Sequence, residues 1–243
     1  MAADLHLGFE AAFKESRILF DLSSKSKVQD DIRKLIRLYC INKLILLGDI
    51  KASIKRISKY EWQEVPEFFD YISKYAGTYI VPGNHDGNIS LLVPESVTIC
   101  SVKGIVLGDT LLTHGHVMPT ANRGSIKRIV MGHVHPKFSK ANSILNSQPV
   151  WIFLKARKEK IFTCAEGLVD IVIVPSLNSA IYPEVQKTSS QVSPIIKRVF
   201  EHNAVESVIA VTLDGSIIAD KHDALALLLP KNSSAETIVS LRG

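Results

Sequence analysis

The chain has 243 residues, of which 46% are hydrophobic and 22% are charged, and its formal net charge is +5. This balance favours a packed core over disorder, and no apolar run approaches the ~20 residues that a membrane-spanning helix needs. Three scattered cysteines exclude a disulfide framework. Since no secretory signal is evident either, we expect a reduced, cytoplasmic protein, and the basic balance permits an anionic partner.

The first third of the chain predicts helices that alternate with strands. Apolar stripes at helical spacing indicate one helix over residues 28–39 and another over 62–75, which starts or kinks at Pro66. Continuous apolar runs, typical of buried parallel strands, cover 44–47 and 78–81.

The rest of the chain predicts mainly strands. They are expected at 105–107, 111–113, 129–131, 150–154, 161–164 and 171–174, with a final hairpin at 208–213 and 216–219. Residues 155–160 are expected to form a solvated turn, Ser193 and Pro194 to open a short helix, and the apolar tail 225–229 to pack on the body. With no repeat and no low-complexity linker, the sequence predicts one domain over 1–243.

Polar clusters follow four of these strands, and a fifth lies near the N-terminus. They hold six of the eight histidines: Asp4-Leu5-His6, Gly48-Asp49, Gly83-Asn84-His85-Asp86, His114-Gly115-His116 and Gly132-His133-Val134-His135. In an open α/β sheet, ligands bind beyond the carboxyl ends of the strands, so we expect these clusters to converge.

The residue types in the clusters predict a metal centre. Carboxylates, an amide oxygen and imidazoles suit Mn²⁺, Fe or Zn²⁺, and the absence of cysteine ligands argues against structural zinc. Seven candidate ligands are too many for one small ion but suit two ions that share Asp49: Asp4, His6, Asp49, Asn84, His114, His133 and His135. Two such ions about 3.5–4 Å apart stabilise both the attacking and the leaving oxygen of a displacement at phosphorus.

In this order, the five motifs resemble the calcineurin-like metallophosphoesterase superfamily. Three stretches are similar to its SbcD-related, ICC-like branch of archaea and bacteria: Asp4-Leu5-His6-Leu7-Gly8-Phe9-Glu10, Leu47-Gly48-Asp49-Ile50-Lys51 and Gly132-His133-Val134-His135-Pro136. The motifs span 4–136, and residues 173–178 are similar to that branch's C-terminal strand and loop.

The resemblance implies a four-layer α/β/β/α sandwich of two mixed sheets flanked by helices, completed by the strands and hairpins of 150–243. That fold needs a strand leading into Asp4, yet only three residues precede it. We therefore expect a truncated N-terminal strand, a frayed segment at Asp4 and His6, and weak occupancy of the first metal site.

The resemblance also implies a role for each site residue. One metal would be held by Asp4, His6 and His135, and the other by Asn84, His114 and His133, with Asp49 bridging. A metal-bound hydroxide would attack phosphorus directly. His85 would assist the leaving oxygen, and Asp86 would orient His85.

Three further residues are candidates for substrate contact. Many superfamily members carry a second acidic residue at the position of Ala52, whereas here Lys51-Ala52 follows Asp49. Lys51 either meets a substrate phosphate or is an exposed loop lysine. His116 contacts the substrate, ligates a metal or only lines the cleft, and Arg123 either clamps a phosphate or is a solvated loop residue.

Together these features predict an enzyme that hydrolyses a phosphodiester of nucleotide or nucleic-acid type with two divalent ions, expected to be Mn²⁺. Two alternatives stay open. One is a catalytically weak phosphoesterase fold that serves as a scaffold for protein interaction, against which the presence of His85 argues. The other is a phosphomonoesterase.

Overall fold

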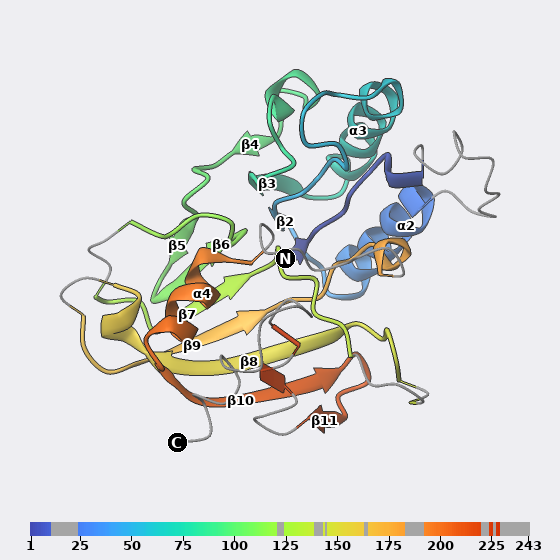
Figure 1. Ribbon diagram of the computed structural model, residues 1–243. Helices are drawn as coiled ribbons and strands as arrows, with labels where there is room; N and C mark the ends of the chain where they lie inside the picture. The colour runs from blue at the N-terminus through green and yellow to red at the C-terminus, as the bar shows by residue number, and fades with distance from the viewer. Residues whose placement is uncertain are drawn as a thin grey trace. The chain divides into compact units, whose positions relative to one another are not determined.

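The computed structural model describes residues 1–10, 24–120, 124–138, 143, 145–162, 165–182, 192–219, 224–225 and 227–228 (Figure 1). The chain divides into two compact units that alternate along the sequence. Unit 1 comprises Met1–Ile105, Leu112–His114 and Ser176–Ile181, and unit 2 comprises Val106–Leu111, Gly115–Pro175 and Tyr182–Gly243. The single domain over 1–243 stays a prediction.

Unit 1 contains a four-stranded sheet in the order β1-β2-β3-β4, and every described pairing in it is parallel. Its strands are β1 (Ala2–Ala3), β2 (Lys43–Leu47), β3 (Gly77–Val81) and β4 (Thr98–Ile99). The apolar runs at 44–47 and 78–81 are therefore strands, as predicted, and β1 is as short as predicted. The parallel pairing follows from the helical crossovers that join β2 to β3 and precede β2.

The helices of unit 1 are α2 (Ser24–Leu38) and α3 (Lys59–Ile72). They pack against each other (Figure 1), and buried apolar side chains from both helices and from the sheet form one hydrophobic cluster. A short 3₁₀ turn, η1 (Ile89–Leu91), follows β3. The two predicted helices are thus both present, with earlier starts than the apolar stripes indicated.

The start of α3 is set by a capping box. The Ser58 hydroxyl accepts the Glu61 N–H, and the Glu61 carboxylate accepts the Ser58 N–H, so the helix begins at Lys59 and Pro66 lies inside it. Trp62, which opens the predicted apolar stripe, is 51% exposed, whereas Glu61 is fully buried. Capping chemistry, and not hydrophobic periodicity, therefore decides which residues of this first turn face inward.

Unit 2 forms most of a second sheet, in the order β11-β10-β8-β9-β7-β6-β5. Its strands are β5 (Ile105–Leu107), β6 (Thr110–Thr113), β7 (Arg128–Met131), β8 (Val150–Arg157), β9 (Leu168–Ile173), β10 (Val205–Thr212) and β11 (Ile217–Ala219). β7 and β9 are parallel, whereas β8 is antiparallel to β9 and to β10. The mixed pairing that we predicted for both sheets thus occurs in this one.

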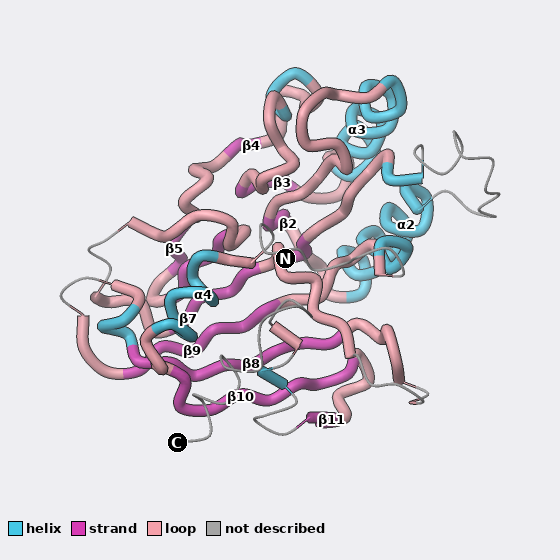
Figure 2. Tube along the Cα trace, viewed as in Figure 1, coloured by secondary structure: helices cyan, strands magenta, loops and turns pink. Residues whose placement is uncertain are grey.

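The core of unit 2 lies on one face of this sheet. It includes helix α4 (Pro194–Glu201), which begins with Ser193 as its N-cap, as predicted. It also includes Leu225, Leu227 and Leu228, so the packing expected of the tail is confirmed for these residues. Figure 2 shows that strands and loops, in magenta and pink, make up most of this unit.

The segment after β8 differs from the prediction. Buried and exposed residues keep alternating along the strand through Ala156, so β8 runs to Arg157, and only Lys158–Lys160 form a 3₁₀ turn, η2. Ile161 and Phe162 form a turn and a bend instead of the expected strand, and residues 163–164 lie outside the described residues. Among the described helices, none has the length and hydropathy to cross a bilayer.

Candidate metal centre

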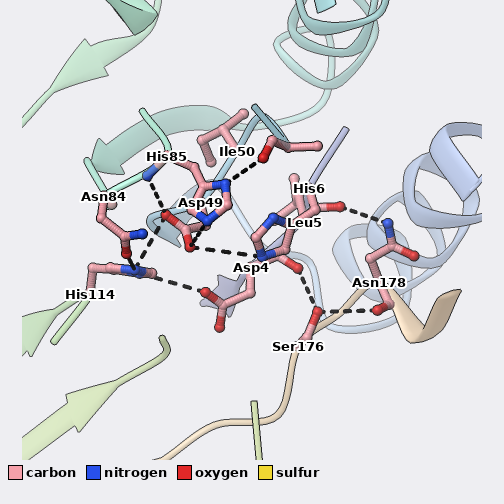
Figure 3. Close-up of polar contacts among 12 residues, drawn as sticks. Asp4, Leu5, His6, Asp49, Ile50, Asn84, His85, His114, Ser176 and Asn178 are labelled. Carbon is pink, nitrogen blue, oxygen red and sulfur yellow. Dashed lines mark hydrogen bonds and ion pairs between the residues drawn. The ribbon is translucent and has the colours of Figure 1, made fainter. Parts of the chain in front are cut away.

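Polar residues of unit 1 gather where its parallel strands end (Figure 3). Asp4 follows β1, Asp49 follows β2 and Asn84 follows β3, so the parallel alignment brings them to one edge of the sheet. Asp4, His6 and Asp49 each offer one ligand atom, and these three atoms lie within 4.8 Å of one another. The predicted convergence is thus confirmed for these three residues.

The backbone at the motifs is unusual. Nine described residues other than glycine have a positive φ, and five of these are predicted metal ligands: Asp4, His6, Asp49, His133 and His135. The left-handed region is disfavoured for side chains with a Cβ, and such backbone strain concentrates at functional sites. The left-handed backbone of these motif residues costs conformational free energy, and a binding site at the motifs accounts for that cost.

The segment from Asp4 to His6 is hydrogen-bonded on two sides. The N–H groups of Asp4 and His6 donate to the carbonyls of Gly48 (3.1 Å) and Asp49 (2.9 Å). Three consecutive residues donate to three consecutive carbonyls: Leu177 N–H to Ala3 (3.0 Å), Ser176 Oγ to Asp4 (2.6 Å) and Asn178 Nδ2 to Leu5 (2.9 Å). Asp4 and His6 are also buried. The fraying that we expected here is wrong, because the loop 176–178 compensates for the short β1.

His114 brings three atoms with lone pairs together. Its Nδ1 lies 2.9 Å from the Leu47 carbonyl oxygen, which can only accept, so Nδ1 carries the proton. Its Nε2 then faces the Asn84 Oδ1 at 3.1 Å and the Asp49 Oδ1 at 3.3 Å (Figure 3). A cation between these atoms would stabilise the arrangement, and two oxygens with one imidazole nitrogen suit a divalent transition metal.

The electrostatics of this group agree with a cation site. Burial opposes the charged form of His114, but the charge of Asp49 and the hydrogen bond with it, helped by Asp4, outweigh burial and raise the pKa of His114 to about 9. Burial likewise opposes ionisation of Asp49, yet His114, His6 and His85 hold its pKa well below the usual value. The carboxylates that stabilise a proton on His114 would also stabilise a metal ion, which would displace that proton.

His85 and Asp86 hold different parts of the site. The Asp86 carboxylate accepts the N–H groups of Ile50 (2.8 Å) and Gly83 (2.8 Å), and burial, reinforced by the charge of Asp49, raises its pKa to about 6. These bonds fix the loop backbone. The Ala52 carbonyl accepts the Nδ1 proton of the His85 ring, and the Nε2 on the other side of the ring lies 3.8 Å from the Asp49 carboxylate. The orienting role of Asp86 stays a prediction; its carboxylate accepts these hydrogen bonds from the loop backbone.

The three residues that are candidates for substrate contact lie in different parts of the chain. Lys51 is fully buried and its Nζ donates to the Ser53 carbonyl, so it is not an exposed loop lysine. His116 lies in unit 2 with its ring centroid 6.2 Å from that of His133. His133 and His135 follow β7, and Arg123 lies outside the described residues.

Sequence reasoning missed three polar residues that hold the site: Glu61, Ser176 and Asn178. The spacing of Ser58 and Glu61 is a capping-box signature and could have identified Glu61. The other two lie in the stretch 173–178 that resembles the C-terminal strand and loop of the SbcD-related branch, but no local signal gives their role, because each contacts a carbonyl more than 170 positions away.

No known family model and no curated protein matches the chain. Similar solved structures exist. The crystal structure of Pseudomonas putida nuclease MPE is 20% identical, with 72% of each chain covered and a TM-score of 0.47.

Yfce, a phosphoesterase from E. coli, is 16% identical, with 90% of this chain and 94% of that chain covered and a TM-score of 0.43. At these values neither likeness assigns a reaction or substrate to this chain. Its mixed α/β architecture, with two sheets and flanking helices, fits the fold expected from the motifs.

Proposed function

We propose that this protein is a metal-dependent phosphoesterase of the SbcD-related branch, and that it hydrolyses phosphodiesters of nucleotide or nucleic-acid type in the cytoplasm. The observation that supports this best is the convergence of Asp4, His6 and Asp49 at the strand ends of unit 1. His114 and Asn84 extend this donor set. We include His133 and His135 because of their motif and their left-handed backbone.

We propose two divalent ions for this ligand set, Mn²⁺ before Fe or Zn²⁺. When bound, such ions activate water and neutralise charge on the phosphoryl oxygens. The chain's own residues would do the rest. The Nδ1 proton of His85 is donated to the Ala52 carbonyl, so Nε2 is the nitrogen that would carry the second proton of the imidazolium form and give it to the leaving oxygen.

Positive charge would assist the binding of a phosphodiester. The Lys51 ammonium is directed to a backbone carbonyl, so we propose that it acts through its field near Asp49 and not by direct contact. His116 and Arg123 stay proposals for direct substrate contact, and Asp86 is proposed to support His85 through the loop backbone.

Hydrolysis of bis-p-nitrophenyl phosphate and p-nitrophenyl phosphate tests the proposal. We expect turnover that Mn²⁺ stimulates and a chelator abolishes, with the diester preferred. His85→Ala should lower kcat by roughly 10²-fold because the leaving oxygen loses its acid, while Mn²⁺ affinity stays unchanged. The matched control His202→Ala replaces an exposed histidine just after α4 and should behave as wild type.

Each other outcome selects a different function. If neither ester is hydrolysed with Mn²⁺, the enzyme proposal fails and the scaffold alternative takes its place. If the monoester is preferred, the protein is a phosphomonoesterase. If the diester is preferred, cyclic nucleotides and single-stranded DNA are the natural substrates to compare next.

A further inference from the structure

Glu61 is a buried carboxylate that lies outside the metal motifs. It belongs to the first turn of α3, and each of its two oxygens accepts one backbone N–H: that of Ser58 at 2.6 Å and that of Ser53 at 2.6 Å. The bond to Ser58 completes the capping box of the helix. The bond to Ser53 is not needed by the helix, and it reaches into the loop that follows β2.

The peptide group between Ala52 and Ser53 links Glu61 to His85. Its N–H donates to Glu61 Oε1, and its C=O accepts the Nδ1 proton of His85. In a trans peptide the N–H and the C=O point in opposite directions. The carboxylate, the peptide group and the imidazole therefore form one continuous chain of hydrogen bonds, in which each bond polarises the next.

The surroundings hold this chain in place. A Cβ at Gly8 would lie only 2.8 Å from Glu61 Cγ, so the carboxylate side chain fills the space beside that glycine. Lys51 Nζ donates to the Ser53 carbonyl, the next carbonyl along the loop. At the other end, His85 Nε2 lies 3.8 Å from Asp49 Oδ2, so the ring edge opposite Ala52 faces the candidate metal centre (Figure 3).

We propose that Glu61 is a positioning residue for His85. Acting through the Ala52–Ser53 peptide group, it fixes the proton on Nδ1 and the orientation of the ring, so that Nε2, the nitrogen that carries the acidic proton when both ring nitrogens are protonated, faces the reacting phosphoryl group. The catalytic consequence rests on the proposed function, whereas the structural link between Glu61 and His85 does not.

The test compares Glu61→Gln with Ser58→Ala. Glu61→Gln keeps the shape of the side chain but removes its charge and one of its acceptor oxygens. Ser58→Ala removes the capping hydroxyl, which accepts the Glu61 N–H at 3.2 Å, but leaves the chain from Glu61 to His85 intact. Both variants weaken the helix cap, so only an effect confined to Glu61→Gln reports on positioning.

Two readouts are measured. The ¹⁵N and ¹H NMR signals of the His85 ring should show the Nδ1-protonated tautomer in wild type and in Ser58→Ala, and a mixture of tautomers in Glu61→Gln. With diphenyl phosphate, whose phenolate leaves less readily than p-nitrophenolate, Glu61→Gln should lower kcat roughly 10-fold more than with bis-p-nitrophenyl phosphate, with KM unchanged.

The outcomes separate this inference from the proposed function. A wild-type tautomer and a wild-type leaving-group dependence in Glu61→Gln overturn the inference, as do equal effects in Ser58→Ala. If wild type hydrolyses neither ester, the proposed function fails, and the NMR comparison still decides the link. Should Glu61→Gln not fold, the Ser53 amide proton is measured in His85→Ala: a changed chemical shift supports the coupled chain, and an unchanged shift refutes it.

Discussion

The substitution Gly83→Ala tests how closely the turn after β3 approaches Asp49, the candidate bridging carboxylate. A Cβ there would lie 2.1 Å from Asp49 Oδ1 and 2.4 Å from the Asp49 backbone nitrogen, so the atoms would overlap. To regain ordinary contact, the carboxylate must shift by about 1 Å, several times the roughly 0.2 Å that metal–ligand distances tolerate. We expect Gly83→Ala to lower Mn²⁺ affinity by about 10²-fold and the free energy of unfolding by about 1–3 kcal/mol.

Isothermal titration with Mn²⁺ measures the affinity, and denaturant unfolding after chelation measures the stability. Gly87→Ala is the matched control, because a Cβ there would meet only the Ile54 carbonyl oxygen, at 3.9 Å. The control should stay within about 0.5 kcal/mol of wild type and keep its metal affinity. If Gly83→Ala bound Mn²⁺ as tightly as the control does, the position of Asp49 would not govern metal binding and the reasoning would be refuted.

Two further predictions concern stability. Ser176→Ala or Asn178→Ala removes a hydrogen-bond donor from a buried carbonyl of the Asp4–His6 segment, so each should lower the free energy of unfolding by about 1–3 kcal/mol and weaken Mn²⁺ binding. Ser179→Ala replaces an exposed serine and should change neither quantity. Equal effects in all three variants would contradict the proposed support of this segment by residues 176–178. The folded-state pKa of His114, about 9, lies above its unfolded value of about 6.5, so the charged ring stabilises the chelated protein fully below pH 6.5 and this stabilisation is lost as the pH rises through 9. Unfolding free energies between pH 6 and 10 should show that fall in wild type and a smaller fall in His114→Gln; matching profiles would rule the explanation out.

Much of the site could be predicted from sequence because its ligands follow strands that are recognisable as apolar runs. β2 and β3 contain continuous apolar runs, and Asp49 and Asn84 follow them within three residues, so their meeting at one sheet edge follows from parallel pairing. The short helix after Ser193 was predictable for a similar reason, since its cap and its proline are adjacent in sequence.

The supporting contacts were not predictable in this way. Asp4 and His6 looked exposed to fraying because only a two-residue strand precedes them, and nothing nearby in sequence shows that 176–178 would hold their backbone. The sequence allows Lys51 to be an exposed loop lysine or a phosphate contact, and its burial excludes the first. In each case a side chain donates to a backbone carbonyl, and a carbonyl leaves no side-chain signature in the sequence.

The sequence by itself therefore determined the ends of the strands that precede the motifs, the order of the motifs and the types of ligand, because periodicity, turn chemistry and residue type are local properties. Only the tertiary structure decided how those ligands are held: the left-handed backbone at Asp4 and Asp49, and the peptide group that joins Glu61 to His85. Such features depend on which distant segments pack together, since the cost of strain or of a buried charge is offset only by contacts that folding creates.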